Sequence, residues 1–296
     1  MSQIILNNTI QGHTEEGSRT TMRQDKPDLG LLNLHRDRLA AAAEALGWRN
    51  LPCLEHTNGS PRLLQESLEH YENSLPPPPA DRQERRKLRI LIGRDGSISI
   101  DSIVINLSTS ISRILPLEHP FMPLSLDEPA PVNARKPCEV YVDHQPTRPS
   151  MFTTHKTTHR CVYNAARSRA NLEPTTIPTA TEVLLYNSNN EIIETSLCTI
   201  YFRREGTWIT PAAICGPNLG VTRRLAMENG LCKQGTIELR DLKRNETVWL
   251  SNAVRGFFRG VLKVDEKGSS EMTESKETTL NRLGAGMSSG SGVGGS

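Results

Sequence analysis

The sequence predicts an α+β protein of two domains, with a helix and a β-hairpin in the first and mostly strands in the second. The apolar spacing changes from helical to alternating near residue 88, and a proline-rich segment at 116–137 resembles an interdomain linker. Hydrophobic residues make up 36% of the chain, enough for a core in its middle but not at its ends. We therefore expect a split near residue 125, giving domains at 28–125 and 126–268.

The two ends and one internal segment differ in composition from the rest. Residues 1–27 are polar and lack sustained periodicity, which predicts disorder. Residues 269–296 end in SSGSGVGGS, which is typical of a flexible tail. Residues 74–87, SLPPPPADRQERRK, combine four prolines with mixed charges, and we expect a surface loop there.

The first domain contains one clear helical pattern and one hairpin pattern. The predicted helix is indicated by a spacing of three and four positions through Leu32, His35, Leu39, Ala42 and Leu46, and Gly47 ends it. Residues 88–92 and 97–105 alternate like strands, with Asp95-Gly96 as the turn between them.

The second domain reads as a series of strands with few helices. Residues 198–204 and 207–210 form a second hairpin around Glu205-Gly206, and VTRRLAMEN before Gly230 is a helix with a glycine cap. The remaining predicted strands are 138–143, 181–187, 191–195 and 247–252.

Bulk properties exclude several classes of partner. A formal net charge of +2 gives no strong field for nucleic acid or a membrane surface. The six cysteines contain no C-x-x-C pair, so neither a metal site nor a disulfide framework is predicted. No apolar run near 18 residues and no signal peptide stand in the sequence, and we expect a soluble cytoplasmic protein.

Lys156 is the first residue whose context suggests chemistry. It lies among threonines and directly before an Ala/Arg-rich helical segment. A lysine at a strand-to-helix junction can project into a cleft, where desolvation lowers its pKa and suits it to Schiff-base formation. The simpler interpretation is an exposed lysine, and the spacing alone leaves both open.

Two further segments could bind a charged ligand. In residues 215–225, CGPNLGVTRRL, Val221 and Thr222 begin a helix after a glycine-bracketed loop, which is typical of an anion site. The alternative is an ordinary helix start with Thr222 as its cap. Glu194 ends an apolar run, and a carboxylate beside a buried strand needs a partner such as a protonated ring nitrogen, unless it is exposed.

Together these segments resemble the fold-type IV, or class IV, pyridoxal-phosphate (PLP) enzymes. That family includes branched-chain and D-amino acid aminotransferases and 4-amino-4-deoxychorismate lyase. The paired threonines around Lys156 and the segment YNAARSRA look closest to the eukaryotic lyases. Four motifs carry the resemblance in the family's order: HRDRL at 35–39, FTTHKTTHR at 152–160, EIIETSLCTIYFRREGTWITP at 191–211 and GPNLGVTR at 216–223.

The resemblance implies a role for each candidate residue. It makes Lys156 the Schiff-base lysine and Glu194 the partner of the PLP ring nitrogen. Arg38 would contact the phosphate, together with the backbone amides of Val221 and Thr222 and the Thr222 hydroxyl. Weaker candidates for the phosphate cup are Asn252 and Ala253.

The resemblance also implies an architecture and an activity. It implies a small α/β domain, a larger pseudo-barrel α+β domain, and a homodimer acting on a small molecule. The implied reaction converts 4-amino-4-deoxychorismate into 4-aminobenzoate and pyruvate for folate precursor synthesis. The alternatives are a class IV aminotransferase and a truncated, inactive homologue.

Two positions and one segment depart from the family pattern. The usual asparagine after the glutamate is Thr199, and the tyrosine expected five residues after the lysine is Cys161. The nearest tyrosine, Tyr163, is expected to point elsewhere from its helix. Residues 1–30 do not show the family's first strand, so either this segment is divergent or the small domain lacks that strand, and we expect the second.

Overall fold

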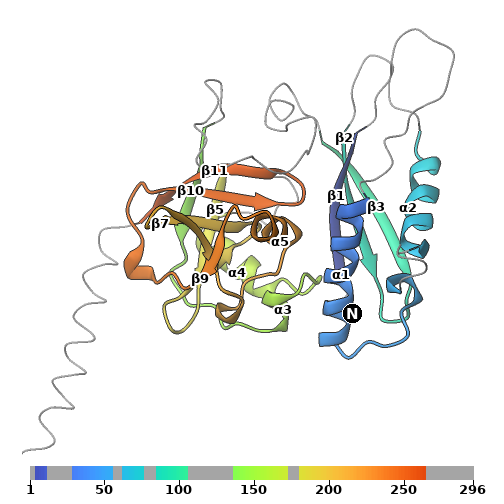
Figure 1. Cartoon of the computed structure of the whole chain (residues 1–296), viewed down its shortest axis with the longest axis horizontal. Coiled ribbons are helices and arrows are strands. Elements are labelled where there is room, and N and C mark those ends of the chain that lie inside the picture. Colours follow the sequence, from blue (N-terminus) through green and yellow to red (C-terminus); the bar gives the residue numbers. More distant parts are fainter. Residues whose placement is uncertain are drawn as a thin grey trace, which may run out of the picture.

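The structure is a computed structural model that describes residues 4–11, 29–55, 62–76, 85–105, 136–172 and 180–264. Its elements form two parts (Figure 1). The predicted α+β architecture is confirmed. The proposed boundary at residue 125 and most of the predicted linker lie outside the described residues, as do residues 12–27 and the tail at 269–296.

The first part is a three-stranded antiparallel sheet with two helices. Its strands run in the order β1-β2-β3, and its core contains Leu32, Leu39, Leu64 and Ile90. Helix α1 lies on the side nearer the second part, and α2 lies farther away (Figure 1). The elements are β1 (Ile4–Gln11), α1 (Leu29–Ala45), a 3₁₀ turn at Pro52–Leu54, α2 (Arg62–Ser74), β2 (Arg85–Ile92) and β3 (Ile98–Ile105).

Strand β1 corrects the expectation that this domain lacks its first strand. The sequence predicted disorder over 1–27, yet residues 4–11 pair antiparallel with β2 along their whole length, from Ile4 opposite Ile92 to Gln11 opposite Arg85. The segment IILNNTIQ has two asparagines at its centre and shows only a weak strand pattern by itself. Backbone hydrogen bonds with β2, which is distant in sequence, stabilise this strand although its own β-propensity is weak.

The predicted helix and hairpin of this part are both present. Gly47 follows α1 with φ +67°, and the turn between β2 and β3 closes where the Gly93 amide donates to the Ser97 carbonyl at 2.9 Å. Helix α2 was not predicted, because apart from three leucines and one tyrosine its sequence is polar, and only Leu64 and Leu68 are buried. Of the predicted surface loop at 74–87, Ser74 ends α2 and residues 85–87 belong to β2, while residues 77–84 lie outside the described ranges.

The second part is a curled eight-stranded sheet in the order β6-β5-β4-β11-β10-β7-β8-β9. The Ile192 amide of β6 donates to the Ile237 carbonyl at 2.8 Å, so the segment after β9 meets the opposite end of the sheet and gives it a barrel-like form. All strands predicted here are present: β4 (Cys138–Val142), β5 (Thr181–Tyr186), β6 (Ile192–Thr195), β7 (Thr199–Arg204), β8 (Thr207–Pro211) and β10 (Thr247–Asn252), joined by β9 (Lys233–Gly235) and β11 (Gly256–Lys263).

Short helices cover this sheet and bring it against the first part. They are α3 (Met151–Thr154), α4 (Cys161–Arg169) and α5 (Val221–Glu228), with 3₁₀ turns at Ala213–Cys215 and Leu239–Asp241. Helix α5 packs against β10 and also meets α1, where Arg224 and Asp37 form an ion pair of 2.8 Å. Within the described ranges, no helix combines the length and apolar character needed to cross a membrane.

Candidate active site

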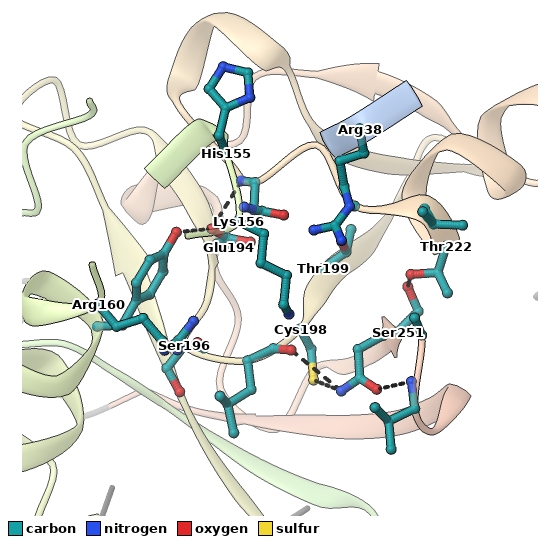
Figure 2. Close-up of a pocket in the computed structure, with 18 of the residues that line it drawn as sticks. Arg38, His155, Lys156, Arg160, Glu194, Ser196, Cys198, Thr199, Thr222 and Ser251 are labelled. Carbon is teal, nitrogen blue, oxygen red and sulfur yellow. Dashed lines mark hydrogen bonds between the residues drawn. The ribbon is translucent and has the colours of Figure 1, made fainter. Parts of the chain in front are cut away.

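A pocket lies where α1 of the first part faces the curled sheet. Its volume of about 120 Å³ is roughly ten times what a single water requires. The structure brings every predicted site residue to its lining: Arg38, Lys156, Glu194, Val221, Thr222, Asn252 and Ala253. Residues separated by more than 200 positions thus meet at one place (Figure 2).

Lys156 extends into the pocket from the connection between α3 and α4 (Figure 2). Ser150 caps α3 through a reciprocal pair of bonds with Thr153, which fixes the end of the connection that precedes the lysine. Burial, together with the nearby cations Arg38 and Arg160, lowers the pKa of Lys156 to about 7. The side chain still touches the open pocket. A substantial neutral fraction therefore exists at neutral pH, as a nucleophilic amine requires.

Glu194 on β6 is buried, with 5% of its surface exposed, so the alternative of an exposed strand end is wrong. Its Oε1 accepts hydrogen bonds from the Tyr163 hydroxyl at 2.5 Å and the Asn218 amide at 3.0 Å. Burial raises the pKa of Glu194 to about 7, against the lowering effect of Tyr163. Among the described residues no donor bonds Oε2, which leaves that oxygen for a ligand.

The start of α5 and Arg38 form the other end of the pocket. The N-cap of α5 is Gly220, which makes no side-chain cap, so the alternative of Thr222 as the cap is wrong. The first amides of a helix have no partner within it, and here they belong to the lining residues Val221 and Thr222. Arg38 points into the same pocket from α1 (Figure 2). Amides, a hydroxyl and a guanidinium at one place can hold an anion.

Asn252 and Ala253 line the pocket from the turn between β10 and β11. The Asn252 Oδ1 accepts from the amides of Val254 and Arg255 at 3.0 and 2.9 Å, and its Nδ2 donates to Cys198 Sγ at 3.1 Å. The asparagine side chain therefore shapes the turn.

The charges around the pocket favour an anionic ligand. Four basic side chains line it, while Glu194 is the only carboxylate among the lining residues that the structure describes. A pocket with this excess attracts anions and can hold a phosphate group together with other acidic groups. The four basic residues are Arg38, Lys87, Lys156 and Arg160.

Several lining residues were not predicted. Tyr163 is one of them: it lines the pocket and donates to Glu194, so it does not take the place of the tyrosine that the family has at Cys161. Arg160 lies over the Tyr163 ring at 4.7 Å and donates to the Ser196 carbonyl at 2.7 Å. Arg160 belongs to the motif at 152–160 that contains Lys156, so the sequence could have indicated it. Lys87 belongs to no such motif, and only the three-dimensional structure shows that it lines the pocket.

The model of the amino-transferase class IV family matches residues 19–262. This span covers most of the chain, and the chain therefore belongs to that family. The resemblance drawn from the four motifs is confirmed at this level.

Two yeast relatives carry more specific names. A Schizosaccharomyces pombe protein provisionally named aminodeoxychorismate lyase is 29% identical over 150 residues, which cover 49% of this chain and 64% of the relative. The Saccharomyces cerevisiae aminodeoxychorismate lyase is 26% identical over 196 residues, covering 60% of this chain and 51% of the relative. The chain thus spans between half and just under two thirds of these relatives.

Solved structures of the family share the fold. A provisionally named amino-acid aminotransferase from Mesorhizobium loti matches 88% of this chain and all of its own with a TM-score of 0.57 at 20% identity. A provisionally named 4-amino-4-deoxychorismate lyase from Legionella pneumophila matches 89% of this chain and 83% of its own with a TM-score of 0.55 at 14% identity. A protein named as an aminotransferase and one named as a lyase both share this fold, so the fold alone does not distinguish the two reactions.

Proposed function

We propose that this chain is a PLP-dependent lyase that converts 4-amino-4-deoxychorismate into 4-aminobenzoate and pyruvate. One observation carries the cofactor assignment: Lys156, with its lowered pKa, shares a pocket with the buried Glu194 carboxylate and with the anion-binding start of α5. The names of the two yeast relatives support the choice of lyase.

The residues present fit the cofactor at both ends. Arg38, the amides of Val221 and Thr222, and the Thr222 hydroxyl suit its phosphate, and the Oε2 of Glu194 suits its ring nitrogen. Asn252 and Ala253 complete the phosphate end from the β10–β11 turn. Lys156 would hold the cofactor covalently. When bound, PLP supplies a ring that withdraws electrons from the reacting carbon.

The protein's own part in the reaction is proton transfer and orientation. The Lys156 amine takes the proton from C4 of the substrate as general base, which its lowered pKa allows near neutral pH. Loss of the enolpyruvyl group then makes the substrate ring aromatic, which provides the driving force. Basic side chains around the pocket favour a substrate that carries carboxylates.

The direct test is to incubate the purified chain with PLP and 4-amino-4-deoxychorismate and to follow pyruvate release. The expected result is pyruvate and 4-aminobenzoate in equal amounts, and none from Lys156→Ala. A wild-type chain that binds PLP covalently but releases no pyruvate would refute the lyase assignment.

A class IV aminotransferase is the second candidate, favoured by the family and by its presence on the same fold. Such an enzyme would move an amino group from an amino acid to a 2-oxo acid, and it would release no pyruvate from aminodeoxychorismate. Supplying amino donors with a 2-oxo acid acceptor and measuring the new amino acid separates the two. A chain inactive in both assays would be the truncated, inactive homologue.

We further propose a cytoplasmic homodimer with its cofactor between the domains, as the class IV resemblance implies. Light scattering of the purified chain tests the dimer, and a fluorescent fusion tests the location. A monomeric mass at working concentration would refute the proposed homodimer.

A further inference from the structure

Three buried hydroxyl groups form a continuous chain behind the phosphate end of the pocket. The Tyr201 hydroxyl of β7 lies 2.8 Å from Ser251 Oγ of β10, and Ser251 Oγ donates to Thr222 Oγ1 of α5 at 2.9 Å. The three residues expose 0%, 1% and 3% of their surfaces, respectively. Ser251 and Thr222 line the pocket, and Tyr201 bonds to Ser251 from the core (the Thr222–Ser251 bond is drawn in Figure 2).

The hydrogen bonds between the three hydroxyls run in one direction, because each hydroxyl carries a single proton. Ser251 gives its proton to Thr222, so the bond between Tyr201 and Ser251 must be donated by Tyr201. Thr222 accepts a bond and keeps its own proton. Within the described part of the chain no acceptor takes that proton, although a buried hydroxyl normally has one. The acceptor is then expected to come from a molecule in the pocket.

We infer that the Tyr201–Ser251–Thr222 chain holds Thr222 as a hydrogen-bond donor to a phosphate oxygen, with Tyr201 as a positioning residue that never touches the ligand. This rests on the proposed function only in taking PLP as the ligand that brings the phosphate. Arg38 and the first amides of α5 lie at the same pocket end and favour an anionic acceptor.

The surroundings of Tyr201 suit this role. Its ring packs in a tilted arrangement against Phe257, with centroids 5.6 Å apart, and lies in a core cluster with Ala226 and Cys232. The ring is thus held by packing that does not involve its hydroxyl. Burial raises the pKa of Tyr201 well above its usual value, so the hydroxyl keeps its proton and remains a donor. Without it, Ser251 could rotate and accept the Thr222 proton itself.

The experiment compares two ligands that differ only in the phosphate. Apo protein is titrated with PLP and with pyridoxal, and the Kd of each is measured by fluorescence. Tyr201→Phe keeps the packed ring and should weaken PLP binding about tenfold, as expected for one hydrogen bond to an anion, while pyridoxal binding stays unchanged. Tyr186→Phe on β5, a half-buried tyrosine away from the pocket lining, should change neither Kd.

A double-mutant cycle separates positioning from a general loss of packing. Thr222→Val removes the terminal donor at nearly constant volume, and in that background Tyr201→Phe should have no further effect on PLP binding. Equal weakening of PLP and pyridoxal by Tyr201→Phe, or an undiminished effect in the valine background, overturns the inference. If circular dichroism shows that Tyr201→Phe does not fold, Ser251→Ala breaks the same chain and should give the same selective loss.

The tests of the three linked hydroxyls and of the proposed reaction have distinct outcomes. A wild-type protein that prefers PLP to pyridoxal through this chain but releases no pyruvate supports the inference and refutes the lyase. A wild-type protein that binds PLP no better than pyridoxal overturns the inference whatever reaction it catalyses.

Discussion

Tyr163 donates a hydrogen bond of 2.5 Å to Oε1 of Glu194, and both side chains are buried. The same oxygen also accepts from the Asn218 amide, so two donors hold one side of the carboxylate, and no donor among the described residues bonds Oε2. The position five residues after Lys156, where the resemblance to class IV enzymes led us to expect a tyrosine, is Cys161. In this chain the tyrosine instead supports the residue proposed to bind the ring nitrogen.

Tyr163→Phe should therefore alter the titration of Glu194. Burial raises the pKa of Glu194 to about 7, and the bond from Tyr163 lowers it, so losing the hydroxyl should raise the pKa by about one unit. The pH dependence of the absorbance of bound PLP should shift upward by a similar amount. Tyr186→Phe serves as the control, and an unchanged titration in Tyr163→Phe would show that the bond does not control Glu194.

Covalent capture of PLP should depend on pH through Lys156. Burial and nearby cations lower the pKa of Lys156 to about 7, so the amine is mostly protonated below that pH and mostly neutral above it. Only the neutral amine attacks a carbonyl, and the capture rate should rise as the pH passes through about 7. An ordinary lysine would show this rise near its reference value of about 10.4.

Borohydride trapping and peptide mass spectrometry would measure that capture at each pH. Lys156→Arg should abolish it, because the guanidinium stays protonated. Lys136→Arg is the matched control, since the Lys136 side chain is 81% exposed. Capture that persists in Lys156→Arg, at another lysine, would refute the assignment.

The sequence identified residues whose local pattern signals their role. Lys156, Glu194 and Thr222 each stand in a short motif with a stated chemical purpose, and all three reach the pocket. Tyr163 was missed because helical spacing predicts a direction but not what a neighbouring strand places there. Strand β1 was missed because its order depends on pairing with residues far along the chain.

A buried charged network supports the segment that follows Glu194. Arg167 donates to Ser196 Oγ at 2.9 Å, and Ser196 Oγ donates to Glu182 at 2.8 Å; both charged residues are 1% exposed. Glu182→Ala leaves the Arg167 charge buried without this partner and should lower the free energy of unfolding by about 3–5 kcal/mol. Urea denaturation measures this change.

The double variant Arg167→Met, Glu182→Leu provides the comparison for that prediction. Removing both charges avoids a buried Arg167 charge that has lost Glu182. The double variant should therefore be more stable than Glu182→Ala alone. A double variant that is less stable than the single would show that the network stabilises the fold by more than charge balance.

Gly216 packs closely against Pro149 in a backbone conformation that favours glycine. It adopts φ +97°, and a Cβ added there would lie 2.4 Å from Cβ of Pro149. Gly230 also has a positive φ, of +68°, but nothing lies within 4 Å of its added Cβ. Gly230→Ala should therefore lose only about 1 kcal/mol of stability from backbone strain, whereas Gly216→Ala should lose about 2–4 kcal/mol from strain and overpacking together.

The effect of Gly216→Ala should also reach the pocket, because Gly216 begins the loop that carries the Asn218 amide to Glu194. Moving this amide removes one of the two donors to Oε1, so PLP should bind more weakly in Gly216→Ala and normally in Gly230→Ala. Thermal unfolding and PLP titration of the two variants measure both effects. Equal stabilities would mean that the loop yields around Pro149 without strain, and unchanged PLP binding would mean that the Asn218 amide is not needed to orient Glu194.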